Sequence, residues 1–474
     1  MNFANRNDSF NTRPNVVVIG AGPGGYVCAI RLAQRGKNVV LVEKHQLGGE
    51  CLNYGCIPSK ALIFASSLYD KLTKSSQFGI EIEGAKFNPQ KLQEWRQNLV
   101  KKLNQGIGFL LKQNKVEVVQ GEASFMSAHK VSIKKSDGSH EEIEAEKFVI
   151  ATGSRTAKIP GFEFDDNLVI SSQKALELAD IPSTLLVLGG GVIGLELGMY
   201  FSKLGSQVTI VELLPQLLNE VDPELVSVLE RSLKKRNITI MKNTKAVRME
   251  MTPRVKLIVE TGGAQQELMG DKLLVTVGRL ANTESLNLKN AGVLADNKGF
   301  IKVNTNLETN APNIYAIGDV IGAPLLAHKA SFQGIQVADS ITHGESVKKR
   351  PIAHAIFTDP EIAGVGLTQL QAEAQGFEVK VGKFPFMALG RAVSVGDVEG
   401  FTKIIADKKT DVVLGVFIVG AHASDLISEG ALAVTHQLKL KDIAGTIHPH
   451  PTLSESIMEA SEAALGEAIH ISNK

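Results

Sequence analysis

Two cysteines five positions apart are the residues of this chain best suited to redox chemistry. Cys51 and Cys56 lie in the segment GGECLNYGCIPSK. Five residues of regular helix would separate them by about 7.5 Å, beyond the roughly 7 Å between Cα atoms that an unstrained disulfide spans. A bond between them therefore requires the backbone to leave regular helix, and Gly55 provides that freedom. Pro58 suits an early turn of a following helix, whose first amides would stabilise a thiolate.

Inert packing and metal binding are the other interpretations of this pair. No second pair of ligands with suitable spacing accompanies the cysteines, so we expect no metal site. Glycines precede the cysteines and separate them, which suits a shaped loop better than a core. Cys28, the third cysteine of the chain, lies in a predicted helix and is expected to be a core residue. With so few cysteines, any disulfide is expected to be catalytic rather than structural.

A second concentration of reactive side chains is the segment HPHPTLSE, which runs from His448 to Glu455 near the C-terminus. Thiol–disulfide exchange needs a base that titrates near neutrality, and histidine is suited to that task. Glu455 is placed to orient an imidazole and stabilise its charge, in the manner of a dyad. Because most histidines are structural or surface residues, the catalytic interpretation of this segment depends on the cysteine pair.

An internal repeat of strand, glycine turn, helix and strand sets the elements that would position these side chains. The two copies lie 169 residues apart, and in each copy an acid follows the third glycine by 18 residues. The apolar runs Val16–Ile19 and Leu185–Leu188 lead into the turns. The turn glycines are Gly20, Gly22 and Gly25 in the first copy and Gly189, Gly191 and Gly194 in the second, and the acids are Glu43 and Glu212.

Each copy has the pattern of a dinucleotide-binding turn. Its first glycine permits a tight bend, its second lets the backbone approach a pyrophosphate, and its third allows close packing of helix on strand. Amides at the helix start then receive the anion. Glu43 and Glu212 can each accept a hydrogen bond from a ribose hydroxyl, and the charge of Glu212 should repel the extra phosphate of NADP. We expect two nucleotide sites, the second for NAD; ordinary turns without a ligand are the alternative.

A further acid, Asp319, closes the segment TNAPNIYAIGD directly after an apolar strand. Open α/β sheets collect ligands at the carboxyl ends of their strands. Asp319 is therefore a candidate to bind a ribityl hydroxyl of FAD, with a simple turn as the alternative.

The fold class predicted from these patterns is α/β, with two doubly wound Rossmann-like nucleotide-binding domains and a C-terminal α+β domain. Phe148–Ser154 runs into a tight turn between the domains, and another buried strand, Leu273–Val277, ends at a second turn. In the tail we expect strands at Phe401–Ile405 and Val412–Val419, followed by helices from Ala423 and Ser454. The expected domains are 1–154, 155–280, 281–350 as a return to the first domain, and 351–474.

Composition excludes several classes of partner. Lys plus Arg, 51, nearly equals Asp plus Glu, 50, so no overall charge favours nucleic acid or an anionic membrane. No apolar run approaches the about 18 residues of a membrane span. The first fourteen residues resemble neither a secretion signal nor a convincing transit peptide. A soluble, cytoplasmic protein is expected, since three cysteines suit a reducing compartment.

With these residues assembled, the sequence from Val16 to Ala468 resembles the pyridine nucleotide-disulfide oxidoreductases, and within them the members that oxidise dihydrolipoamide. The resemblance is carried by the cysteine segment, both glycine turns, Ala316–Asp319, Leu325–His328 and the HPHPTLSE segment. Four departures loosen the choice of subfamily. They are Glu50 and Tyr54 where threonine and valine are commoner, Ala246 where valine is usual, and Ala281 where a proline is frequent.

The resemblance implies a role for each candidate site residue. Cys51 would exchange with the lipoyl sulfur and Cys56 would face the flavin, while His450 and Glu455 would act as the acid–base pair from the other subunit of a homodimer built on the tail. Besides the glycines of the first turn, the FAD site would comprise Glu43, Lys60, Gly121, Thr152, Gly153, Asp319, Leu325, Leu326, Ala327 and His328. Besides those of the second turn, the NAD site would comprise Glu212, Ala246 and Gly278.

The function implied is oxidation of protein-bound dihydrolipoamide through the cysteine pair and FAD to reduce NAD. The partner would be a lipoyl-bearing acyltransferase of a 2-oxoacid dehydrogenase complex or the carrier protein of glycine cleavage. A glutathione reductase would prefer NADP, against which Glu212 argues, and a mercuric reductase usually carries more cysteines near its C-terminus. A noncatalytic assembly subunit is the alternative from another class, and the retained cysteines and His450 count against it.

Overall fold

The structure is a computed structural model that describes residues 14–473. The chain forms two compact units. The first comprises the chain up to Ala61 together with Lys91–Ala157 and Gly278–Lys349, and the second comprises Leu62–Gln90, Lys158–Val277 and the chain from Arg350 onward. The domain boundaries expected at residues 154, 280 and 350 stay a prediction.

A parallel sheet of five strands in the order β18-β7-β1-β2-β3 forms the centre of the first unit. All its neighbouring strands run in the same direction. The strands are β1 (Val16–Ile19), β2 (Val39–Glu43), β3 (Glu117–Gln120), β7 (Lys147–Ile150) and β18 (Ile314–Ala316). Strands β1 and β2 are buried throughout, as their uninterrupted apolar runs predict for a sheet covered on both faces.

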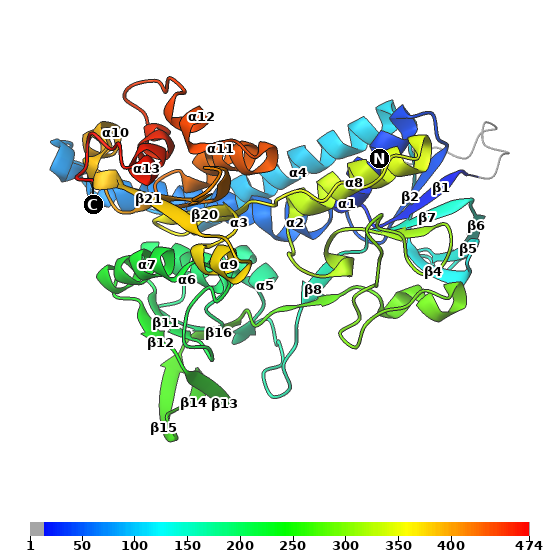
Figure 1. Ribbon diagram of the computed structural model, residues 1–474. Coiled ribbons are helices and arrows are strands. Elements are labelled where there is room, and N and C mark those ends of the chain that lie inside the picture. The colour runs from blue at the N-terminus through cyan, green and yellow to red at the C-terminus, as the bar shows by residue number, and fades with distance from the viewer. Residues whose placement is uncertain (1–13, 474) are drawn as a thin grey trace. The chain divides into compact units, whose positions relative to one another are not determined.

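Both faces of this sheet are covered, but by different layers. Because successive strand residues point to opposite faces, Val16 and Val18 pack with the helices, whereas Val17 and Ile19 pack with an antiparallel sheet. The helices include α1 (Pro23–Gln34), α4 (Pro89–Gln113) and α8 (Ala327–His343), of which α1 and α8 lie side by side (Figure 1). The antiparallel sheet comprises β4 (Glu122–Ser127), β5 (Lys130–Lys134) and β6 (His140–Glu144).

The second unit contains the same arrangement again. A parallel sheet in the order β12-β11-β10-β16-β9 carries the second copy of the repeat, and a three-stranded antiparallel sheet packs on one of its faces. The parallel strands are β9 (Val169–Ile170), β10 (Thr184–Leu188), β11 (Gln207–Val211), β12 (Thr239–Met241) and β16 (Lys272–Val275). The antiparallel strands are β13 (Thr244–Met251), β14 (Val255–Thr261) and β15 (Ala264–Gly270), and the helices are α5 (Ser172–Glu177), α6 (Val192–Lys203) and α7 (Pro223–Lys235).

The tail of the chain forms an antiparallel sheet in the order β19-β20-β23-β22-β21, on which α11 and α13 pack. Its strands are β19 (His354–Ile356), β20 (Glu361–Gly366), β21 (Val379–Pro385), β22 (Phe401–Asp407) and β23 (Val413–Gly420). Its helices are α9 (Gln369–Ala374), α10 (Gly390–Val395), α11 (Ala423–His436), α12 (Leu440–Ala444) and α13 (Glu455–Leu465). The α+β tail is therefore confirmed, including the strands and helices expected from Phe401 onward.

Short elements connect these layers. Helix α2 (Gly49–Tyr54) and helix α3 (Cys56–Thr73) carry the cysteine pair. Strand β8 (Ser154–Thr156) pairs with β17 (Arg279–Ala281) in a small antiparallel sheet of the first unit. The single-turn helices are η1 (Ser75–Phe78), η2 (Glu284–Leu286), η3 (Leu288–Ala291), η4 (Gly318–Ile321) and η5 (Phe386–Ala388).

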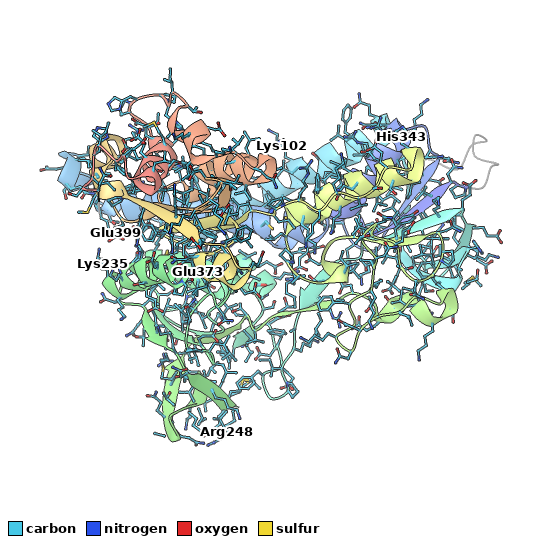
Figure 2. The ribbon with its side chains drawn as sticks, viewed as in Figure 1. Lys102, Lys235, Arg248, His343, Glu373 and Glu399 are labelled. Atoms are coloured by element: carbon cyan, nitrogen blue, oxygen red, sulfur yellow. The ribbon has the colours of Figure 1, made fainter. Side chains whose placement is uncertain are left out.

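Charged side chains cover the surface of each unit. In the second unit, Lys235 at the end of α7 pairs with Glu399, and both are labelled in Figure 2. Such exposed pairs contribute at most about 1 kcal/mol each, so the stability of the units comes from their buried sheets. Within residues 14–473, no helix combines the length and the apolar character that crossing a membrane requires.

Candidate functional site

The first glycine turn has the three features that a bound dinucleotide needs. Gly20 adopts a φ of +100°, and a Cβ there would lie 2.5 Å from the carbonyl oxygen of Ala151. A Cβ on Gly25 would lie 1.8 Å from the oxygen of Gly20, so helix and strand touch at this point. A Cβ on Gly22 would meet no atom nearer than 4.0 Å, which leaves the space that a pyrophosphate takes. No side chain caps the start of α1, so its first amides are available to an anion.

The second turn reproduces this geometry. Gly189 has a φ of +106°, and a Cβ on Gly194 would lie 2.2 Å from the oxygen of Gly189. A Cβ on Gly191 would meet nothing within 4 Å, and α6 starts without a side-chain cap. Both turns therefore fit a dinucleotide in the way that the sequence predicts.

The acids of the two copies also have equivalent hydrogen bonds. Glu43 accepts from the amides of Ala21 and His45, each at 2.7 Å. Glu212 accepts from the amides of Gly190 and Leu214, at 2.6 and 2.8 Å. Each carboxylate thus binds the amide of the residue directly after the first glycine of its own turn. A carboxylate oxygen has a second lone pair, which can accept from a ribose hydroxyl.

Residues implied by resemblance lie near these acids in the chain fold. In the first unit, the amide of Gly121 donates to the carbonyl of Glu43 at 2.9 Å. In the second unit, Ala246 lies on β13, whose first residue donates to the carbonyl of Glu212 at 3.0 Å. A Cβ on Gly153 or on Gly278 would meet no atom within 4 Å. The roles of these four positions stay a prediction.

Asp319 lies in η4 at the carboxyl end of β18 and accepts a 2.6 Å hydrogen bond from the hydroxyl of Ser154. The Thr152 hydroxyl, in the turn after β7, donates to the carbonyl of Asn282 at 2.7 Å. This bond ties that turn to the segment that returns to the first unit. Leu325 and Leu326 precede α8, and Ala327 and His328 are its first residues, with no side-chain cap at its start. The next residue, Lys329, is buried and donates to the carbonyls of Gly322 and Pro324 at 2.6 and 3.0 Å. Burial lowers the pKa of Lys329, while Asp319 acts in the opposite direction.

The cysteine segment folds back onto the first glycine turn. The amide of Gly48 donates to the carbonyl of Ala21 at 2.8 Å, and a Cβ on Gly49 would lie 2.6 Å from the Cα of Gly22. Asn53 is buried and donates from its side chain to the carbonyls of Leu47 and Gly49. Close backbone approach therefore requires glycine at position 49, and a φ of +88° favours it at position 48.

The helix breaks between the two cysteines, as the sequence predicts. Helix α2 ends at Tyr54, Gly55 has a φ of −133° and a ψ of −109°, and α3 begins at Cys56. No disulfide joins the pair in this structure, and a side-chain hydrogen bond with Cys56 is the largest cause that raises the pKa of Cys51, ahead of burial. Lys60 acts to lower the pKa of Cys51. Cys28 is fully buried in the core, which confirms the expectation for the third cysteine.

The two histidines of the HPHPTLSE segment have different environments. His448 is buried and bonded through Nε2 to Glu429 at 2.9 Å and through Nδ1 to the carbonyl of Thr446 at 2.8 Å. His450 is 77% exposed, and its Nδ1 lies 2.9 Å from Glu455 Oε1. Burial raises the pKa of Glu455, but the amide of Thr452 and His450 outweigh it, so its pKa lies below the ordinary value. The carboxylate is thus ionised at neutral pH and orients the exposed imidazole through its Nδ1 atom.

Sequence patterns missed one group of residues at this site. Arg279 binds Glu50 and Ser154 within the first unit. In the sequence, Glu50 stands out only as a departure from the commoner threonine, and a charge directly before Cys51 is the one signal available. Its partner lies 229 positions away, so no local spacing indicates it.

Comparison with known proteins agrees with this geometry. Residues 14–334 match the family model described as pyridine nucleotide-disulphide oxidoreductase, and residues 352–461 match the dimerisation domain of the same family. The chain therefore belongs to the pyridine nucleotide-disulphide oxidoreductase family, which confirms the predicted fold class and the expectation of an FAD- and NAD-dependent oxidoreductase.

Curated relatives indicate the branch of the family. The dihydrolipoyl dehydrogenase of Thermus scotoductus is 44% identical over 97% of this chain and 99% of its own length, and that of Bacillus subtilis is 43% identical over 98% of both chains. Among solved structures, LpdA from Mycobacterium tuberculosis has a TM-score of 0.89 at 28% identity, over 94% of this chain and 99% of its own. The HOCl-induced flavoprotein disulfide reductase RclA of Escherichia coli has a TM-score of 0.84 at 28% identity, over the same shares.

Proposed function

We propose that this chain is a dihydrolipoyl dehydrogenase, which oxidises protein-bound dihydrolipoamide through Cys51 and Cys56 and reduces NAD. The observation that carries the proposal is the break at Gly55, which lets two cysteines on successive helices form a side-chain hydrogen bond. Sulfur atoms in such contact can exchange between dithiol and disulfide without moving the surrounding helices. Near full-length relatives at 43–44% identity that bear this name support the choice of substrate.

In the oxidised pair, a substrate thiolate attacks the sulfur of Cys51 and displaces Cys56 as a thiolate. The second sulfur of the substrate, as a thiolate, then attacks the first. This forms the cyclic disulfide of lipoamide, breaks the bond to Cys51 and leaves both cysteines reduced. Cys56 is the first residue of α3, an 18-residue helix, and the positive end of that helix stabilises its thiolate. Bound FAD would take the electron pair from the dithiol and deliver it as hydride to NAD.

His450 is suited to accept the substrate's proton. Glu455 holds its Nδ1, and the ring is otherwise exposed, so the Nε2 atom is accessible to a substrate. By resemblance to the family, the proton would go to His450 of the partner subunit. The matched dimerisation domain supports a homodimer, which would complete each site.

The carrier of the lipoyl group is proposed to be a separate chain, either the acyltransferase of a 2-oxoacid dehydrogenase complex or the glycine-cleavage carrier protein. The cytoplasmic location expected from the sequence stays a prediction.

Replacement of single cysteines tests the proposal. Cys56→Ser and Cys51→Ser should each abolish dihydrolipoamide oxidation, because neither variant can form the disulfide. NADH oxidation by ferricyanide, which bypasses the pair, should persist in both variants. Unchanged dihydrolipoamide turnover in Cys56→Ser would overturn the mechanism, and a wild-type enzyme that prefers glutathione disulfide with NADPH would overturn the choice of substrate.

A further inference from the structure

Arg279 connects helix α2, which carries Cys51, to the turn that carries Asp319. It is the first residue of β17, and its side chain is only 16% exposed. Its Nη2 donates to Glu50 Oε2 at 2.5 Å and to the carbonyl of Ser154 at 2.9 Å, while its Nε donates to the Ser154 hydroxyl oxygen at 2.7 Å. One guanidinium therefore holds two segments that lie more than a hundred residues apart in sequence.

The connection continues through Ser154 to Asp319. The Ser154 side chain is buried, and a hydroxyl has a single hydrogen. Because Arg279 donates to its oxygen, that hydrogen is committed to Asp319 Oδ2 at 2.6 Å. The four side chains thus form a continuous series from the residue before Cys51 to the acid at the end of β18.

Helix α2 needs such an anchor. It has only six residues, far fewer than the about 12 that make an isolated helix even marginally stable in water. Its orientation must come from tertiary contacts. Asn53 supplies one, because its side-chain oxygen accepts from the Asn104 side chain at 3.4 Å, and Glu50 supplies another. Glu50 also places a negative charge next to Cys51, and Arg279 balances it. A threonine at position 50, the commoner residue in the family, has neither that charge nor that reach.

We propose that Arg279 is a positioning residue for Cys51. Arg279 fixes helix α2 against the turn that carries Asp319, and it balances the charge of Glu50. The inference rests on the proposed function, since it assigns Arg279 a part in the thiol half of that reaction. In this proposal Arg279 acts through Glu50 and Ser154.

The test separates the two half-reactions by anaerobic stopped flow. Arg279→Met should slow flavin reduction by dihydrolipoamide about tenfold, equivalent to about 1.4 kcal/mol, and Glu50→Thr should slow it about threefold. Since both act through one contact, the double variant should be no slower than Arg279→Met alone. Ferricyanide reduction by NADH should stay within about twofold in every variant. Arg155→Met is the matched control, because Arg155 lies on the paired strand and binds the exposed Glu284.

A second readout does not depend on turnover. The pH midpoint for iodoacetamide alkylation of the reduced pair should rise in Arg279→Met, where Glu50 loses its cation, and fall in Glu50→Thr, where Arg279 loses its anion. The double variant should return towards the wild-type midpoint. Mere loosening of the helix would not shift the two single variants in opposite directions.

Three outcomes would overturn the proposal: equal slowing of both half-reactions, additive effects in the double variant, or midpoints that move together. If the wild type fails to oxidise dihydrolipoamide, the proposed function fails while the alkylation midpoints still decide the role of Arg279.

Discussion

The two glycine turns of this protein make equivalent hydrogen bonds but lead into different segments of chain. In each copy, the segment after the second strand folds back onto the middle of the turn. In the first unit Gly48 donates to the carbonyl of Ala21, and in the second Leu218 donates to the carbonyl of Gly190 at 3.1 Å. Ala21 and Gly190 are equivalent positions, so one backbone anchor occurs twice.

Beyond that anchor the copies diverge. The first continues directly into α2 and the cysteine pair, whereas the second continues into a loop whose Leu217 is buried against Gly190. The repeat therefore supplies a turn that fits a dinucleotide twice, while only the segment held against the first turn carries the cysteine pair. The first unit adds Asp319 and Arg279 at the same edge of its sheet.

The largest effect should come from breaking one turn at a time. Gly25→Ala would place a methyl group 1.8 Å from a carbonyl oxygen, and Gly194→Ala would place one 2.2 Å from its counterpart. Backbone must move in both variants, at a cost of about 1–3 kcal/mol or more. Gly25→Ala should lose FAD, as measured by flavin absorbance of the purified protein, whereas Gly194→Ala should keep FAD and bind NADH poorly. Loss of FAD in both variants would show that the turns are not independent.

A smaller effect should sharpen the assignment of the second turn to NAD. Glu212→Gln keeps an oxygen that can accept from the Gly190 amide but removes the charge that repels a 2′-phosphate. The ratio of kcat/KM for NADPH to that for NADH should rise about tenfold. Glu43→Gln is the matched control in the first turn and should leave this ratio unchanged. An unaltered ratio in Glu212→Gln would mean that Glu212 does not face the ribose.

The smallest effect concerns the interaction between Cys51 and Cys56, which both belong to the first unit. The hydrogen bond with Cys56 is the largest cause that raises the pKa of Cys51. Removing it in Cys56→Ala should lower that pKa, so at a fixed pH below it more of Cys51 is thiolate. The alkylation rate of Cys51 should therefore reach its half-maximum at a lower pH in the variant than in the reduced wild type. A midpoint at higher pH would contradict the assigned hydrogen bond.

Much of this site was predictable because its spacings are local. The packing at Gly25 and the break at Gly55 each depend on residues within a few positions, and glycine is the residue type that permits them. The pairing of His450 with Glu455 is also local, since both lie within one short segment. Residue types did not predict that the side chain of His448 is buried while that of His450 is exposed, because the environment of His448 depends on Glu429 of helix α11.

The sequence by itself determined the repeated α/β architecture, the two dinucleotide turns, the α+β tail and the segment that carries the cysteines. It could do so because the period of apolar residues and the conformational demands of glycine act over short distances. Tertiary structure alone decided that Arg279 reaches Glu50 and Ser154, and that the hydrogen of Ser154 goes to Asp319. Those bonds join segments far apart in sequence, and their formation depends on how the sheets place the chain rather than on any local pattern.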